Sequence, residues 1–309
     1  MGSKILFLTA PLKERIWGSS YFNEVLHLSE SKEKLGELWS CSGLKESSSL
    51  IVGGEFAGWS LADLYQTHQD LFGSKEKEFP LLVKLLSTSD RLSIQVHPDD
   101  ALAASKGLPS GKSEGWLILS SDEKSGIVYG TSARNKEELE AHVKNNDYGS
   151  ILQDLKVEPG DFIPIPAGTI HALGKDLLVL EIQQSADVTY RFYDYDRLDK
   201  DGKKRPLQTK EAIEATKFAS HYCPVVKAFE NLRSARCLWD NEHFSIDLIR
   251  IEGPYFLRSE EVFGVISLAV GEVSIQGKVL HLGESVVLLK GGECEISGSG
   301  IIAFSKPKK

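Results

Sequence analysis

Two polar residues interrupt an apolar run in the segment SIQVHPDD, which begins at Ser93. Gln95 and His97 are separated by one residue, so on a β-strand both side chains point to the same face. One of the aspartates that follow, Asp99 or Asp100, can cap a short helix. A histidine that faces inward is either a hydrogen-bonded core residue or a metal ligand, and this segment alone leaves both interpretations open.

A second segment, EPGDFIPIPAGTIHALG, fits the pattern G-x5-P-x-G-x2-H at Gly160, Pro166, Gly168 and His171. This pattern is the second signature motif of the cupin family of double-sheet jelly-roll barrels. The resemblance implies that the glycines turn the strands and that the histidine projects into the barrel as a metal ligand. Four matches at fixed positions are more specific than one histidine, and they favour the metal-ligand interpretation of His97.

The first cupin motif supplies an H-x-H pair and a nearby glutamate, which here correspond to Gln95, His97 and Glu114. The glutamate lies 17 positions after the histidine (114 minus 97), so the intervening loop is expected to be an insertion. Together with His171, the set offers two imidazoles, one carboxylate and one amide oxygen. This set suits Zn(II) with an open or water-filled position. Iron(II) oxygenases use a similar set of two histidines and one carboxylate, so the ligand types alone do not exclude iron.

Segments along most of the chain resemble the type I mannose-6-phosphate isomerase (phosphomannose isomerase) family in its short bacterial form. They are KERIWG, GELW, PLLVKLL, LSIQVHPDD, KSE, PAGTIHALG and LEIQQSADVTYRFYDYDR. The resemblance implies an aldose–ketose isomerase, with one Zn²⁺ per chain, that interconverts mannose 6-phosphate and fructose 6-phosphate. The linker before Glu114 is short where longer members carry a helical insertion. The family's site residues correspond to metal ligands Gln95, His97, Glu114 and His171 and to catalytic residues Arg191, Lys112 and Asp187.

The chemistry of such a reaction agrees with these roles. Isomerisation moves a proton between C1 and C2 through an enediol, so it needs an acid/base pair and a group that stabilises the developing oxyanion. A strand over residues 187–195 places Asp187 and Arg191 on one face, where they either act on the substrate or form a structural ion pair. Lys112 is either a general acid/base near the metal or a solvated loop lysine.

Three further basic residues are weaker candidates for binding the substrate phosphate: Lys84, Arg15 and Arg197. Lys84 is the best of them, because it interrupts an otherwise apolar strand, and few roles other than binding the phosphate explain a buried ammonium there.

Bulk properties restrict the class of partner. The net charge of -8, from 36 basic and 44 acidic residues, argues against nucleic acid and anionic membranes as partners, and an anionic small substrate requires that a few basic residues converge locally. The family resemblance implies that this substrate is a small sugar phosphate. No apolar run approaches the roughly 18 residues that span a bilayer, and no signal-peptide pattern is visible. We therefore expect a cytoplasmic protein. A monomer or a weak homodimer is a separate expectation. The four cysteines lie far apart and are expected to be reduced thiols.

The chain is expected to be mainly β with a few helices, arranged as two cupin-type jelly-roll barrels. Helices are predicted from the N-cap Ser60 to about Leu71, over 135–145 with a capping box, and over 209–216. A shift in composition near residue 230 predicts a domain boundary there. With the motifs above, the expected domains are a catalytic zinc-binding domain with helical segments over 1–230 and a metal-free β domain over 231–309.

The C-terminal part repeats the cupin pattern in degenerate form, at Gly283, Leu289, Gly291 and Cys294. Leucine replaces the proline and cysteine replaces the metal-ligating histidine. This barrel is expected to be a scaffold or a pocket wall, with Cys294 as a metal ligand the less favoured alternative.

Two other functions compete with the isomerase: a cupin Fe(II) dioxygenase, and a non-catalytic protein that binds sugar phosphate. Gln95 at a ligand position and the basic residues favour a phosphorylated substrate over an apolar one. The intact set of ligands, together with Arg191, argues against loss of catalysis.

Overall fold

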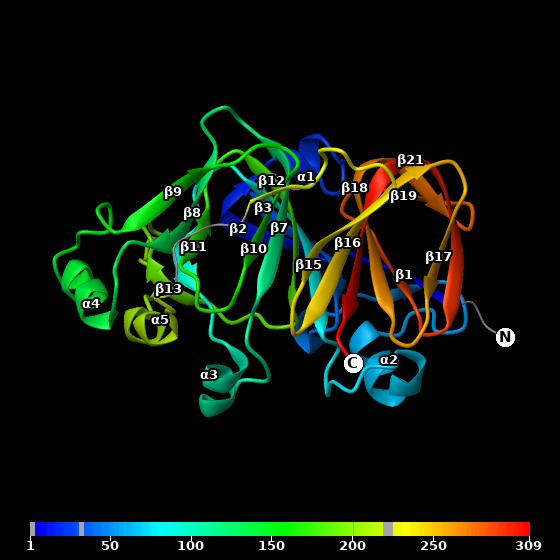
Figure 1. Cartoon of the computed structure of the whole chain (residues 1–309), viewed down its shortest axis with the longest axis horizontal. Helices are drawn as coiled ribbons and strands as arrows, with labels where there is room; N and C mark the ends of the chain where they lie inside the picture. The colour runs from blue at the N-terminus through cyan, green and yellow to red at the C-terminus, as the bar shows by residue number, and fades with distance from the viewer. Residues whose placement is uncertain (1–3, 31–33, 200, 219–224) are drawn as a thin grey trace.

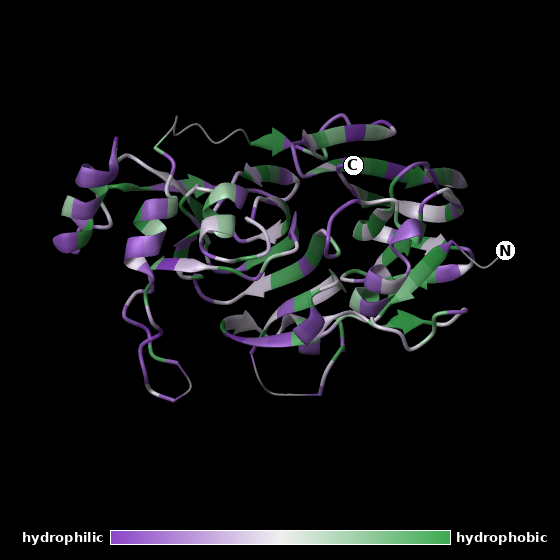
Figure 2. Ribbon diagram, turned by 90° about the horizontal axis from the view of Figure 1, so that it is seen from below, coloured by the Kyte–Doolittle hydropathy of each residue, from purple (hydrophilic) through white to green (hydrophobic). Residues whose placement is uncertain are grey.

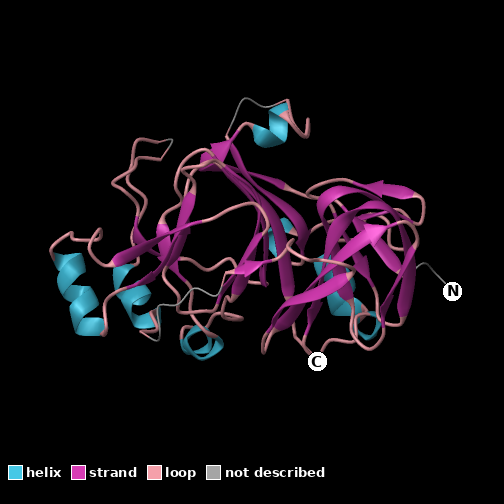
Figure 3. Ribbon diagram, turned by 45° about the horizontal axis from the view of Figure 1, so that its top comes forward, coloured by secondary structure: helices cyan, strands magenta, loops and turns pink. Residues whose placement is uncertain are grey.

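The computed structural model describes residues 4–30, 34–199, 201–218 and 225–309. Figure 1 shows two β-rich halves side by side along the long axis, and Figure 3 shows that strands dominate both, with the helices at their periphery. The prediction of a mainly β fold with few helices is confirmed.

Two facing sheets build the half that contains the metal-binding motifs, and a larger third sheet builds the other half. The first sheet has the order β14 (Val226–Lys227), β10 (Asp161–Ile165), β7 (Glu114–Ser121), β12 (Leu177–Gln184), β5 (Leu81–Thr88), β2 (Leu12–Ser19) and β3 (Leu35–Ser42). The second has the order β13 (Tyr190–Tyr193), β6 (Ile94–Val96), β11 (His171–Leu173), β8 (Gly126–Thr131) and β9 (Leu152–Lys156). Trp116 and Ile163 of the first sheet pack with Ile127 and Leu173 of the second in one buried cluster, which closes this barrel.

The third sheet draws on both ends of the chain. Its order is β15 (Ala235–Asp240), β16 (Phe244–Glu252), β21 (Gly292–Pro307), β18 (Gly264–Ile275), β20 (Ser285–Leu288), β1 (Ile5–Leu8) and β4 (Ile51–Val52). Two more strands, β17 (Tyr255–Ser259) and β19 (Lys278–Leu280), pair with β21 and β18. The N-terminal strands β1 and β4 thus complete a sheet made by C-terminal strands. A domain boundary near residue 230 stays a prediction.

One buried apolar cluster lies between the two halves and ties them together. Val83 and Phe162 contribute to it from the first barrel, and Phe244 and Phe263 contribute from the C-terminal half. Figure 2 shows the matching pattern, with hydrophobic segments along many strands and hydrophilic loops at the periphery. Because the alternate side chains of a strand face opposite sides, the strands of the first barrel bury one face in its interior and the other in this shared core.

Five α-helices lie in the described residues: α1 (Tyr21–Glu24), α2 (Leu61–Thr67), α3 (Asp100–Ser105), α4 (Lys136–Lys144) and α5 (Thr209–Ala215). Single 3-10 turns cover Lys45–Ser47 and Gln69–Leu71. Asp99 caps α3 by accepting a hydrogen bond from the Leu102 N–H, and Asn135 caps α4 in the same way. Only half of the predicted capping box forms, since Glu138 accepts from the Arg134 N–H.

The helix predicted to reach Leu71 is shorter than expected. It begins after the N-cap Ser60, as predicted, but α2 ends at Thr67. The backbone of His68 leaves the helical region (φ -132°, ψ 47°), and its ring packs against Phe56 with 5.6 Å between the centroids. This tertiary contact accompanies the break, and one 3-10 turn follows it.

Candidate metal centre and active site

Three of the predicted ligands converge inside the first barrel. His97, Glu114 and His171 are buried, and their ligand atoms lie within 4.8 Å of one another. Glu114 Oε1 is 3.2 Å from His171 Nε2, and Glu114 Oε2 is 3.4 Å from His97 Nε2. Gln95 lies directly opposite His171 in the pairing of β6 with β11, with its amide nitrogen 3.3 Å from His171 Nε2. The structure therefore brings all four predicted ligands together.

The turn between β10 and β11 explains how the second motif positions its histidine. Gly160 and Gly168 adopt positive φ angles of 90° and 93°, which L side chains rarely adopt. A Cβ at Gly168 would also press against the side chain of Lys217. The Gly168 N–H donates to the His97 carbonyl at 2.9 Å, so one hydrogen bond joins the two motifs.

The protonation states suit a metal. His171 Nδ1 lies 2.8 Å from the Thr169 carbonyl and donates to it, which leaves the lone pair of Nε2 facing Glu114. Burial and the Lys112 ammonium lower the pKa of His97 to about 3, so its imidazole is neutral.

Glu114 supplies the negative charge. Burial alone would raise the pKa of Glu114, but Lys112 and the two histidines hold it well below its ordinary value. Within the described part of the chain, neither of its carboxylate oxygens meets the geometry of a hydrogen bond. A buried carboxylate in that state, beside two imidazoles and an amide, fits a divalent cation.

Lys112 lies in this cluster and is only 4% exposed, so it is not a solvated loop lysine. Its Nζ is 2.8 Å from Glu114 Oε2 and 3.2 Å from His97 Nε2. The loop bends inward because the Lys112 N–H donates to the Pro98 carbonyl at 3.0 Å.

Arg191 reaches the same interior from β13. It lies opposite Gln95 in the pairing of β13 with β6, so the two side chains share a face. Its Nε donates to Ser93 Oγ at 3.2 Å, and its Nη1 donates to the Pro206 carbonyl at 2.9 Å. The guanidinium is thus oriented by neutral acceptors.

The predicted strand over residues 187–195 is wrong at both ends, since β13 covers only Tyr190–Tyr193. A tight turn precedes it, in which the side chain of Gln183 donates to the Ala186 carbonyl at 2.7 Å. Asp187 therefore lies on a connecting segment, and among the described ion pairs none joins it to Arg191. The alternative of a structural Asp187–Arg191 pair is not supported.

Lys84 is the centre of a buried polar network beside the ligands. Its Nζ lies 3.0 Å from Glu181 Oε2 and 2.8 Å from Gln183 Oε1, and 5.3 Å from the ring centroid of Trp39. Burial alone would lower the pKa of Lys84, but Glu181 and other carboxylates nearby outweigh burial and raise it. The ammonium is therefore charged. Glu181 also accepts from Trp116 Nε1 at 3.0 Å, and the Trp116 ring packs on His171.

The two arginines named as weaker phosphate candidates already have carboxylate partners. Arg15 forms a two-pronged pair with Glu37, with both N–O distances at 2.9 Å. Arg197 pairs with Asp194 at 2.6 Å and with Asp90 at 3.3 Å. Of the two, only Arg15 lines the cavity described next.

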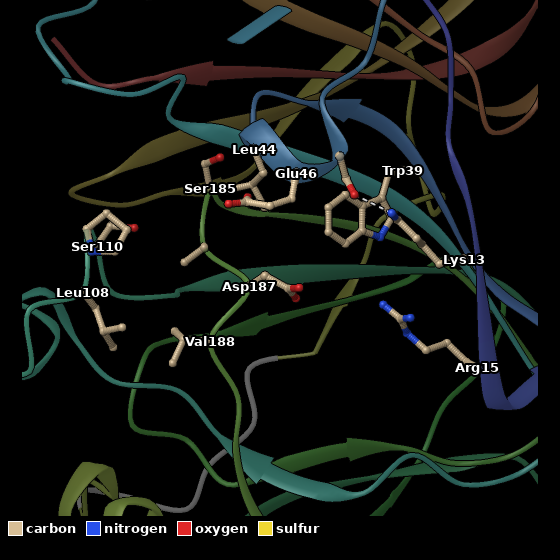
Figure 4. A pocket seen from close by; sticks show the side chains of 13 residues that line it. Lys13, Arg15, Trp39, Leu44, Glu46, Leu108, Ser110, Ser185, Asp187 and Val188 are labelled. Carbon is tan, nitrogen blue, oxygen red and sulfur yellow. Dashed lines mark hydrogen bonds between the residues drawn. The ribbon is translucent and has the colours of Figure 1, made fainter. Parts of the chain in front are cut away.

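A cavity of about 460 Å³ opens beside this network (Figure 4). Arg15 and Trp39 form one wall and Asp187 faces them. Trp39 connects the cavity to Lys84, because it lines the one and packs against the other. The four predicted ligands are not among the residues that line it.

Sequence reasoning missed Lys13, which also lines the cavity. Its Nζ lies 4.9 Å from the ring centroid of Trp39. The alternation of Lys13 with Arg15 in KERIW, two residues apart on one strand, is the signal that predicts a shared face.

No second cluster of metal-ligating His, Cys, Asp and Glu side chains occurs in the described residues. Cys294 is buried in an apolar cluster of the C-terminal half, where burial raises the pKa of its thiol to about 11. This surrounding argues against Cys294 as a metal ligand. In the same described part of the chain, no helix is long and apolar enough to cross a membrane.

Comparisons with known proteins place this site in a family. A family model described as the catalytic domain of phosphomannose isomerase type I matches residues 5–118. A mannose-6-phosphate isomerase of Streptococcus mutans is 34% identical over 92% of each chain. The mannose-6-phosphate isomerase ManA of Bacillus subtilis is 35% identical over 98% of this chain and 96% of its own.

Solved structures agree. The crystal structure of mannose 6-phosphate isomerase from Bacillus subtilis covers 97% of this chain with a TM-score of 0.85 and 32% identity, and 99% of that chain is covered. A structure from Archaeoglobus fulgidus, at 22% identity and a TM-score of 0.75, shares the fold. The chain therefore belongs to the type I mannose-6-phosphate isomerase family.

Proposed function

We propose that this protein interconverts mannose 6-phosphate and fructose 6-phosphate. The observation that carries the proposal is the buried set of His97, Glu114 and His171, with the half-buried Gln95 opposite His171 and Arg191 opposite Gln95. Relatives named as mannose-6-phosphate isomerases match over nearly the whole chain, which supports the same substrate.

We propose Zn²⁺ as the bound metal, one per chain. Two neutral imidazoles, one carboxylate and one amide oxygen would hold it, and this donor set matches a catalytic zinc site better than an all-oxygen magnesium site. Bound there, zinc would supply Lewis-acid stabilisation of negative charge on the sugar oxygens.

The protein's own side chains divide the remaining tasks. Arg191 is charged, and the groups that orient it are neutral acceptors. Its positive charge is therefore available to stabilise the enediolate oxygen or to bind the phosphate. Lys112 lies beside the ligands, with its Nζ 2.8 Å from Glu114 Oε2, and is our candidate for moving the proton. Asp187 faces the cavity and is the second candidate for that role.

Lys84 is better suited to binding than to proton abstraction. Because Glu181 keeps its ammonium charged, Lys84 can donate hydrogen bonds to a sugar hydroxyl or to the phosphate. Arg15 is a weaker phosphate candidate, since Glu37 already balances its charge, and Arg197 is weaker still.

A coupled assay on mannose 6-phosphate, before and after treatment with a chelator, tests the proposal. We expect turnover that chelation abolishes and stoichiometric zinc restores. Purified protein that contains iron and consumes oxygen would instead indicate the dioxygenase. Tight binding of mannose 6-phosphate without turnover after zinc reconstitution would indicate a non-catalytic binding protein.

The oligomeric state in solution is the last property that we propose. We infer a monomer or a weak homodimer, and sedimentation over a range of protein concentrations would test it. A dimer that persists at nanomolar concentration would contradict the inference.

A further inference from the structure

A buried carboxylate behind Arg191 binds two other arginines. Asp194 directly follows β13 and is 4% exposed. Its Oδ1 accepts hydrogen bonds from Arg197 Nη2 at 2.6 Å and from Arg205 Nη2, and its Oδ2 accepts from Arg205 Nε at 2.8 Å. Burial alone would raise the pKa of Asp194, but the two guanidiniums hold it below its ordinary value. The carboxylate is therefore charged, and two cations satisfy it.

Arg191 itself depends on two loops for its orientation. Its side chain donates to Ser93, in the loop before β6, and to the Pro206 carbonyl, in the loop between β13 and α5. Its backbone N–H donates to Gln208 Oε1 at 3.1 Å, in the second of these loops. Each acceptor is neutral and none lies on a strand. The position of the Arg191 guanidinium therefore depends on how firmly these two loops are held in place.

Each loop is held by one of the arginines that Asp194 binds. Arg205 immediately precedes Pro206, so its two hydrogen bonds to Asp194 fix the carbonyl that Arg191 uses. Arg197 Nη1 donates to the Asp90 carboxylate at 3.3 Å and to the carbonyl of the next residue, which holds the loop before β6. Asp194 is thus linked to both acceptors of the Arg191 side chain. Arg205 links it to the Pro206 carbonyl, and Arg197 links it to the loop that carries Ser93.

We propose that Asp194 is a positioning residue for Arg191: by binding Arg197 and Arg205 together, it fixes the two loops whose oxygens orient the Arg191 guanidinium. This inference rests on the proposed function, because it assumes that the reaction uses Arg191. The competing explanation is that the three residues form a structural ion-pair cluster that affects only stability.

A double-mutant cycle on the zinc-loaded enzyme separates the two explanations. We expect Asp194→Asn to lower kcat about 10- to 100-fold, as a misplacement of about 1 Å can, with KM changed less than about threefold and zinc content unchanged. Combined with Arg191→Ala, the same substitution should lower kcat by no more than about twofold beyond Arg191→Ala alone, because the group that it positions is gone.

The matched control is Asp196→Asn, two residues further along the same loop. Asp196 is exposed and pairs with Lys204 at 2.6 Å, so its loss should leave kcat unchanged. If Asp194→Asn does not fold, Arg205→Gln removes the same anchor of the Pro206 loop and should show the same loss confined to kcat.

Two results would overturn the inference: Asp194→Asn or Arg205→Gln with a wild-type kcat, or losses that multiply fully in the double mutant. Both require an active wild-type enzyme. A wild-type protein that does not turn over mannose 6-phosphate would count against the proposed function instead, so the two failures are distinguishable.

Discussion

The two halves of the molecule pair their strands in the same register, but one interior holds the candidate metal ligands and the other is apolar. Gly160 and Gly283 begin matching segments with φ angles of 90° and 88°, and the glycine that ends each turn also has a positive φ. His171 then pairs with Gln95 in the first half, whereas Cys294, at the corresponding position, pairs with Leu257. The turns are shared and the metal ligands are not.

The correspondence extends to the glutamate ligand. Glu114 pairs with Ile165 on β10, and Gly264 pairs with Leu288 at the matching position of β20. A side chain at residue 264 would collide with the ring of Phe304, which fills this space. Hydrophobic packing therefore occupies the part of the C-terminal half where the first barrel holds a carboxylate.

Buried charge follows the same division. Lys84 pairs with Glu181 across β5 and β12, and at the matching positions of the second half Asp247 lies opposite Phe304. Asp247 instead pairs with Lys306 at 3.1 Å, and both side chains are partly exposed, at 27% and 35%. The same strand arrangement can thus enclose a charged site or an apolar core. Charged side chains stay buried in the half where each has a buried partner of opposite charge, and they are partly exposed in the other half.

The largest contrast is expected between the two residues at the ligand position. His171→Ala should remove the metal and lower turnover about a thousandfold or more, since a Lewis acid contributes several kcal/mol. Cys294→Ala should keep metal and turnover and cost only about 1 kcal/mol of unfolding free energy. Metal analysis and the coupled assay on both variants check this. Loss of metal from Cys294→Ala would contradict the division.

A second contrast concerns stability. Lys84→Met leaves Glu181 buried without its cation, which should cost about 3–5 kcal/mol of unfolding free energy. Asp247→Asn, at the matching position, should cost less than about 1 kcal/mol because its ion pair is partly solvated. Urea unfolding of both variants measures the difference. Equal costs would contradict the prediction that the buried Lys84–Glu181 pair is more costly to break than the partly solvated Asp247–Lys306 pair.

A third prediction separates catalysis from metal binding within the first barrel. Arg191→Ala should keep the metal and lower kcat about 100-fold, the effect of removing one oriented donor from a developing negative charge. Metal content and steady-state kinetics on one preparation decide it. If the variant lost its metal as well, Arg191 would be a structural residue.

The smallest effect is expected from an attempt to restore a ligand. Cys294→His should bind no second metal, because Leu257 and Gly264 supply none of the other donors, and overpacking should cost about 1–3 kcal/mol. The measurement is metal stoichiometry after dialysis against excess zinc. Two metals per chain would show that the C-terminal half retains a site.

Local rules predicted the parts of the site that local chemistry controls. The glycines of the second motif need positive φ, and the capping aspartate of α3 needs only its own helix, so both are visible in a short stretch of sequence. Asp187 shows where this fails. Alternation predicts that it shares a strand face with Arg191, but the hydrogen bonds of Gln183 and its neighbours turn the chain first.

The sequence by itself determined the four candidate ligands, the replacement of the ligand histidine by Cys294 in the second copy of the motif, and the largely β fold. Only the tertiary structure decided that Lys84 pairs with Glu181, that Lys112 turns inward, and that β1 completes the far sheet. The physical reason is range. A turn or a cap depends on neighbours along the chain, whereas the buried Lys84 ammonium depends on Glu181 and on Gln183, 99 residues away, which only the closed barrel brings within hydrogen-bond distance.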